Sequence, residues 1–140
     1  MAWMPRPCIR RELIRTNEVI ADVIGLRCRH FRPPYGALNQ RTQQVADGLG
    51  LLTVLWSVAP EDWECPGAAE ISRRVVKSAQ QGDIVLLHDG CGDVLDPSQR
   101  VWLSNIDPER SGTVAALPMI IDGLGRRGLR LANRDARLTS

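Results

Sequence analysis

The chain has 140 residues, a length that suggests one domain with a sizeable core, and its 44% hydrophobic and 24% charged residues are ordinary values for a globular protein. The net charge of +2 is too small, and the arginines are too scattered, to favour a nucleic-acid-binding surface. The four cysteines lack metal-motif spacing, and a disulfide framework is not expected. We recognise no signal peptide and no membrane-spanning run, so the chain as given is expected to be cytoplasmic.

Amphipathic helical patterns alternate with short apolar runs along the chain. Asn39 is a natural N-cap for the second helix. We expect helices at residues 8–24, 40–49, 68–79 and 113–127, and strands at 30–31, 51–58, 84–88 and 129–131, with 51–58 and 84–88 buried on both faces. Residues 91–110 are expected to form a loop and 132–140 a polar tail, all within a single domain of residues 1–140.

This alternation is typical of βα units, and it predicts an α/β fold with mostly parallel strands and outer helices. In such sheets, functional groups gather beyond the carboxyl ends of the strands. Three of the expected strand ends carry reactive side chains, namely Arg32 and Tyr35, Asp62 and Trp63, and His88 and Asp89.

The first of these ends is a stiff loop, Phe31 to Gly36. Pro33 and Pro34 fix two φ angles, and each disfavours the α region for the residue before it. Gly36 then permits a sharp turn. Such rigidity suits a loop that holds Arg32 and Tyr35 in fixed directions, although a simple rigid turn would look the same.

Three ordered motifs resemble those of a known family: FRPPYG at 31–36, WSVAPEDW at 56–63 and IVLLHDG at 84–90. Together with helical segments at 14–20 and 113–124, they resemble the polysaccharide deacetylases, the NodB-homology domains of carbohydrate esterase family four. The resemblance implies a distorted (β/α) barrel that hydrolyses N-acetyl or O-acetyl groups on glycans such as chitin-type oligomers or peptidoglycan. It also implies a divalent metal, often zinc, and full-length relatives that are often secreted or in the cell envelope.

The resemblance assigns catalytic roles to four residues. His88 resembles the general acid that protonates the departing amine, and Asp62 the carboxylate that tunes this histidine. Tyr35 resembles the residue whose backbone N–H helps to hold the oxyanion, and Arg32 the cation that orients the catalytic carboxylate. Amide hydrolysis independently requires an activated water, an oxyanion stabiliser and a proton donor.

Four further residues are expected to contact the substrate. Trp63 resembles a groove wall on which a sugar face can stack, and Leu86 the wall of the pocket for the acetyl methyl group. Pro34 and Asp89 complete the substrate-binding set. The expected partner is therefore an acetylated glycan, without nucleic acid or a membrane span.

Two motifs of the family are absent from this sequence: the paired aspartates and the pair of histidines four residues apart. His30 and His88 are the only histidines, so no metal ligand set and no cofactor are expected in this chain. Ala59 also stands where many relatives carry an aspartate. We expect a partial barrel without its first strands, inactive alone and self-associating through the exposed barrel interior unless residues 91–110 cover it.

Other interpretations remain open from the sequence. The chain could be a relative that binds glycan without cleaving it. It could instead be an α/β module that binds a phosphorylated ligand at residues 89–92, although the glycine signal there is weak. His88 could also be a core histidine with satisfied hydrogen bonds.

Overall fold

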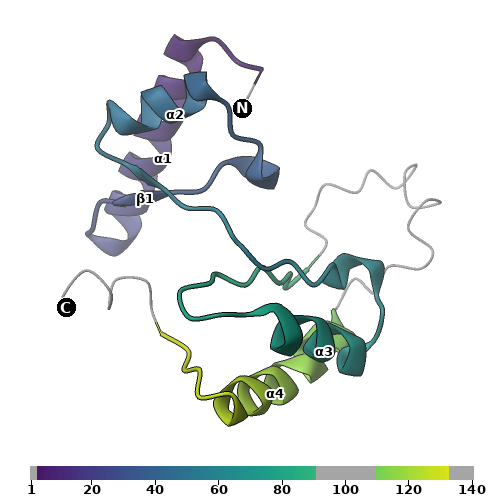
Figure 1. Cartoon of the computed structure of the whole chain (residues 1–140). Helices are drawn as coiled ribbons and strands as arrows, with labels where there is room; N and C mark the ends of the chain where they lie inside the picture. The colour runs from purple at the N-terminus through teal and green to yellow at the C-terminus, as the bar shows by residue number, and fades with distance from the viewer. Residues whose placement is uncertain (1–2, 91–109, 133–140) are drawn as a thin grey trace. The chain divides into compact units, whose positions relative to one another are not determined.

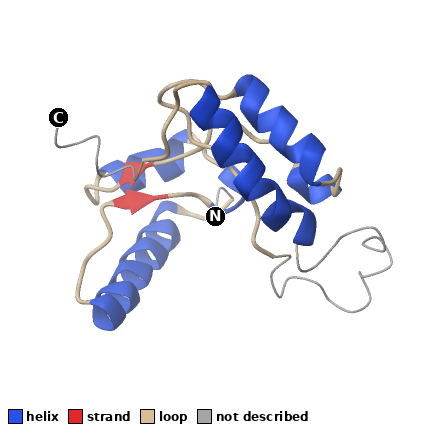
Figure 2. Ribbon diagram, turned by 90° about the horizontal axis from the view of Figure 1, so that it is seen from below, coloured by secondary structure: helices blue, strands red, loops and turns tan. Residues whose placement is uncertain are grey.

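The computed structural model describes residues 3–90 and 110–132, and the chain divides into two compact units, Met1–Leu55 and Trp56–Ser140. Helices dominate both units, and short strands are drawn only in the first (Figures 1 and 2). Of the expected loop at 91–110 and the expected tail at 132–140, residues 91–109 and 133–140 lie outside the described residues.

The first unit contains α1 (Arg6–Ile24), β1 (His30–Phe31), the 3₁₀-helix η1 (Pro34–Gly36), α2 (Gln40–Asp47) and β2 (Leu52–Thr53). α1 ends at Gly25, which has a left-handed φ of 72° and donates its N–H to the carbonyl of Ala21. At the start of α2 the Asn39 side chain accepts from the Thr42 N–H at 2.9 Å, so the predicted N-cap is confirmed.

The core of the first unit lies between these two helices and the strands. Its buried members come from both helices, from β1 and from the residue before β2: Ile9, Leu13, Phe31, Ala46 and Leu51. β1 and β2 pair in parallel, with His30 opposite Leu52. Parallel neighbours joined through a helix are the βαβ arrangement that the sequence pattern predicts.

The second unit contains the 3₁₀-helix η2 (Asp62–Glu64), α3 (Ala68–Ser78) and α4 (Ser111–Arg126). Val58 and Val85 form an isolated parallel bridge, and α3 and α4 pack over it. The buried cluster is aliphatic: Val58, Ile71, Val75, Ala79, Ala116, Ile120 and Leu124. Gly123 permits the close helix contact, because a Cβ built on it would lie 2.5 Å from Cγ2 of Val76.

The strand predictions were too long. Of residues 51–58, only Leu52–Thr53 form a strand and Val58 a bridge, while Val85 is the only bridged residue of 84–88. Leu52 is 50% exposed, so the run is not buried on both faces. No strand forms at the described residues 129–131. An extended run becomes a strand only where a neighbour completes its ladder, and apolar composition does not supply one.

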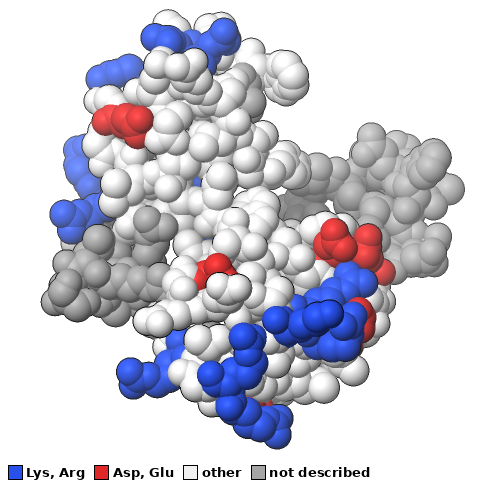
Figure 3. Space-filling view, viewed as in Figure 1, with Lys and Arg blue, Asp and Glu red and all other residues white. Residues whose placement is uncertain are grey.

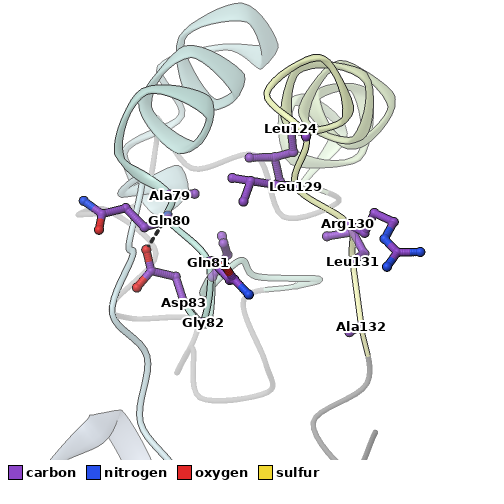
Figure 4. Close-up of a pocket in the computed structure, with 12 residues that line it drawn as sticks. Ala79, Gln80, Gln81, Gly82, Asp83, Leu124, Leu129, Arg130, Leu131 and Ala132 are labelled. Carbon is purple, nitrogen blue, oxygen red and sulfur yellow. Dashed lines mark hydrogen bonds between the residues drawn. The ribbon is translucent and has the colours of Figure 1, made fainter. Parts of the chain in front are cut away.

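None of the described helices is long and apolar enough to cross a membrane. A cavity of about 980 Å³ lies between the C-terminal ends of α3 and α4 (Figure 4). It is lined by side chains such as Gln80, Asp83 and Leu129, and none of the predicted site residues lines it. The predicted site residues of the second unit instead follow the Val58–Val85 bridge in the chain.

Candidate active site

Asp62 is the buried centre of the candidate site. It begins η2, four residues after the bridge at Val58, and its residue surface is only 1% exposed. The turn around it is unusual, because Glu61 and Cys65 on either side of η2 both have left-handed backbones, with φ values of 57° and 54°. This turn directs the Asp62 carboxylate inward while its neighbours stay at the surface.

Three hydrogen bonds converge on that carboxylate. The backbone N–H of His88 donates to Oδ2 at 2.8 Å, and Nδ1 of the His88 ring lies 2.8 Å from Oδ1. The hydroxyl of Thr113, in the first turn of α4, donates to Oδ2 at 3.0 Å. The Asp62 carboxylate therefore joins three parts of the unit: its own loop after Val58, the segment after Val85 that carries His88, and α4.

The short parallel bridge brings His88 to this position. The N–H of Leu86 donates to the carbonyl of Val58 at 2.9 Å, which fixes the two segments side by side just before both reach the site. The structure thus contains the predicted contact between the Asp62 and His88 side chains. His88 is not a core histidine, since its side chain is 35% exposed while that of Asp62 is fully buried.

The hydrogen bonds keep Asp62 ionised. Burial by itself raises the pKa of this carboxyl, but the bonds from the His88 ring, the His88 N–H and Thr113 together outweigh burial, and the pKa lies below its ordinary value. An ionised carboxylate only accepts hydrogen bonds, so Nδ1 of His88 carries the shared proton. The ring nitrogen Nε2 is then the one that can exchange a proton with a substrate.

Trp63 forms a wall beside the histidine. Its ring meets the His88 ring edge-on, with centroids 5.4 Å apart and planes at 87°. Trp63 is 39% exposed, so part of its surface is open to a ligand. Leu86 is half-buried and Asp89 exposed on either side of His88. The postulated phosphate loop at 89–92 lies partly outside the described residues.

The remaining predicted residues, Arg32, Pro34 and Tyr35, belong to the first unit. Nε of Arg32 donates to the carbonyl of Val54 at 3.2 Å, which ties the proline loop to the end of β2. Tyr35 is 87% exposed and has a left-handed φ of 58°. The loop is as constrained as its prolines predict, and the roles of its side chains stay predictions.

Sequence reasoning missed Thr113, which supplies a buried hydroxyl to Asp62. Its only signal was its place at the start of the last predicted helix. For metal ions, the described residues contain no group of three or more His, Cys, Asp or Glu side chains that could hold one. The donor set described here therefore does not fit a divalent metal, and no chemical step is assigned to one.

Comparison with known proteins gives this geometry a family context. The family model described as polysaccharide deacetylase matches residues 1–54. A chitooligosaccharide deacetylase of Azorhizobium caulinodans is 38% identical over 103 residues, which cover 74% of this chain and 47% of that protein. A peptidoglycan-N-acetylglucosamine deacetylase of Bacillus cereus is 43% identical over 102 residues, covering 71% and 40%.

Solved structures of the same family are similar to this chain as well. A family 4 carbohydrate esterase from Streptomyces lividans superposes with a TM-score of 0.71 at 28% identity, covering 93% of this chain and 57% of that one. A pseudoenzyme of the same family from Bacillus anthracis gives a TM-score of 0.75 at 26% identity, covering 96% and 41%.

The chain thus spans about half the length of the relatives it matches. The expected fold class is confirmed as part of a (β/α) barrel of the NodB-homology type. The sequence matches and the superposed structures agree that this chain is similar to the polysaccharide deacetylase family over most of its length.

Proposed function

We propose that this chain carries the proton-donating half of a deacetylase site that acts on N-acetyl groups, or O-acetyl groups, of a glycan such as a chitin-type oligomer or peptidoglycan. The single observation that supports this most is the double contact of Asp62 with the ring and the backbone N–H of His88. Relatives named as chitooligosaccharide and peptidoglycan deacetylases support the substrate class.

The proposed chemistry uses His88 as the general acid. When water has added to the acetyl carbonyl, the C–N bond breaks only if the departing amine nitrogen is protonated, because an amide anion is a very poor leaving group. Nε2 of the His88 imidazolium gives that proton and the ring becomes neutral. Asp62, 2.8 Å from Nδ1, keeps the ring in this orientation and stabilises the imidazolium before transfer.

Trp63 is proposed to bind the sugar next to the reacting acetyl group. Its partly exposed ring stands at the edge of the His88 ring, so a pyranose stacked there would place an N-acetyl substituent near Nε2. Leu86 and Asp89 flank the same position. For Arg32, Pro34 and Tyr35 of the first unit, the catalytic and substrate-binding roles that the family resemblance implies are part of the same proposal.

Metal-dependent turnover by the 140-residue chain alone is not expected, because its sequence has neither the paired aspartates nor the histidine pair. The test is an assay of released acetate from an acetylated chito-oligosaccharide, with added zinc or cobalt. Turnover that a chelator abolishes and metal restores would contradict this expectation.

A second candidate function is glycan binding without cleavage. Two observations favour it: the exposed Trp63 and the structural likeness to a pseudoenzyme of the family. Both candidates require glycan binding at Trp63. The chain has four tryptophans, so the fluorescence change on adding an acetylated chito-oligosaccharide should be compared between the wild type and Trp63→Phe. An identical fluorescence change in both proteins would show that the glycan does not bind at Trp63, and this would contradict both proposals.

Self-association is the remaining proposed property. Two described strands form the only sheet among the described residues, and apolar side chains such as Leu52 and Ile121 are half exposed. Unpaired strand edges and apolar surface favour association. Sedimentation at several concentrations should show a rising mass, and a monodisperse monomer that binds no hydrophobic dye would contradict the proposal.

A further inference from the structure

Arg74, a half-buried residue of α3, contacts the loop that carries Asp62 at three of its residues. Its Nη1 donates to the carbonyl of Pro60 at 2.9 Å and lies 3.4 Å from Glu61 and 3.5 Å from Glu64. One guanidinium thus contacts the residue two before Asp62, the residue immediately before it and the residue two after it. Basic and acidic side chains are seen together over this part of the unit in Figure 3.

Glu70 fixes the other side of the same guanidinium. Nε of Arg74 donates to Glu70 Oε1 at 3.0 Å, one helical turn away on α3. Glu70 also accepts two bonds from Arg73, and the hydrogen bonds from Arg73 and then Arg74 lower the pKa of Glu70 to about 2. Arg74 is therefore anchored to the helix by one edge and reaches the loop with the other, an arrangement that suits the planar fork of arginine.

The loop is one that needs such support. Glu61 and Cys65 adopt left-handed backbones that L-residues other than glycine rarely adopt. Within the loop, the turn is closed by the N–H of Glu64 on the Glu61 carbonyl and the N–H of Cys65 on the Asp62 carbonyl. Relaxation of Glu61 would rotate the peptide bond that precedes Asp62 and so redirect its carboxylate away from His88.

We propose that Arg74 is a positioning residue: it fastens the Pro60–Glu64 loop to α3 and so holds Asp62 and Trp63 around His88. The role rests on the proposed function of His88, but the fastening can be measured without a glycan. Arg73 offers a matched control, since it neighbours Arg74 on α3 and binds Glu70, while no contact of Arg73 with the loop is found among the described residues.

The test compares Arg74→Gln with Arg73→Gln, since each removes one positive charge and one partner of Glu70. Two readouts are followed by NMR in the 140-residue chain without ligand: the His88 Nδ1–H resonance, and the exchange rates of the Glu64 and Cys65 amides. In Arg74→Gln we expect loss of the ring N–H resonance and exchange about tenfold faster, which is roughly what a charge-assisted hydrogen bond contributes. In Arg73→Gln both readouts should match the wild type.

Arg74→Lys covers the case in which Arg74→Gln fails to fold. Lysine keeps the charge, but its single ammonium cannot reach Glu70 and Pro60 in the geometry of a fork. We expect Arg74→Lys to fold with faster loop exchange. Wild-type signals in Arg74→Lys and Arg74→Gln, or equal changes in Arg73→Gln, would overturn the proposal. Loosening of the loop in a protein whose wild type binds no glycan would instead overturn the proposed function and leave the fastening intact.

Discussion

The two units hold their candidate residues in different ways. In the first unit, the Phe31–Gly36 loop is rigid because of its own covalent structure: Pro33 and Pro34 restrict it, and a side-chain bond from Arg32 ties it to Val54. In the second unit, Asp62 lies at the meeting point of segments far apart in sequence, including His88 and Thr113. A site of the first kind tolerates distant substitutions, whereas one of the second kind depends on every segment that meets there.

The largest expected effect is that of Asp62→Ala. It leaves the buried Thr113 hydroxyl and the His88 N–H without their acceptor, so the free energy of unfolding should fall by roughly 3 kcal/mol. Chemical denaturation measures this. Asp122→Ala, at an exposed position of α4, should change stability by less than about 0.5 kcal/mol. Equal losses in both variants would mean that the three segments do not depend on Asp62.

The helix contact that supports the site should be nearly as sensitive. In Gly123→Ala the new methyl group would lie 2.5 Å from Cγ2 of Val76, and we expect a loss of about 2 kcal/mol through overpacking. Gly125→Ala meets nothing within 4 Å and should be stabilising by about 0.5 kcal/mol, since alanine favours a helix. Thermal unfolding of the two variants measures both effects. A Gly123→Ala variant more stable than the wild type would show that α3 and α4 pack less closely than described here.

In the first unit the corresponding test is local. Asn39→Ala removes the N-cap of α2 and should cost about 1 kcal/mol, whereas Asn39→Ser keeps a side-chain acceptor and should cost less. Denaturant unfolding of both variants compares them. A loss for Asn39→Ala as large as that for Asp62→Ala would erase the contrast between the two units.

The pH dependence of stability should come from the second unit. Because the pKa of Asp62 is lower in the folded protein than its ordinary value, its contribution to stability is complete above that ordinary value, about 3.9. The contribution is lost as the pH falls through the lower folded value. The stability difference between wild type and Asp62→Asn should therefore shrink below about pH 4. A difference that stays constant to pH 2 would mean that folding does not depend on Asp62 ionisation.

Local signals explain what the sequence could predict. The helices begin and end within two residues of their expected limits because periodic apolar residues and caps such as Asn39 and Gly25 are local features. The lengths of the strands were overestimated because a strand needs a hydrogen-bonded neighbour, and an apolar run in the sequence does not show whether one is present. Asp62 and His88 were predicted from motifs at the expected strand ends.

Thr113 and Arg74 could not have been found in that way. The Thr113 hydroxyl meets Asp62 across a sequence separation of 51 residues, and Arg74 reaches Pro60 across 14. Neither residue type is unusual in a helix, so nothing in the local pattern marks it. Contacts of this kind become visible only when the segments are placed in space.

The central claim, that Asp62 holds His88 as a proton donor toward a glycan, is tested most directly by nitrogen NMR of the His88 ring during addition of an acetylated chito-oligosaccharide. We expect Nδ1 to keep its proton and hydrogen bond in the wild type, and the Nε2 resonance to shift on addition. The shift should be absent for a cello-oligosaccharide, which lacks acetyl groups, and the Nδ1 hydrogen bond should be weakened in Asp62→Asn. An Nε2 resonance that does not shift when the acetylated oligomer is added, or an Nδ1 signal unchanged in Asp62→Asn, would contradict the claim.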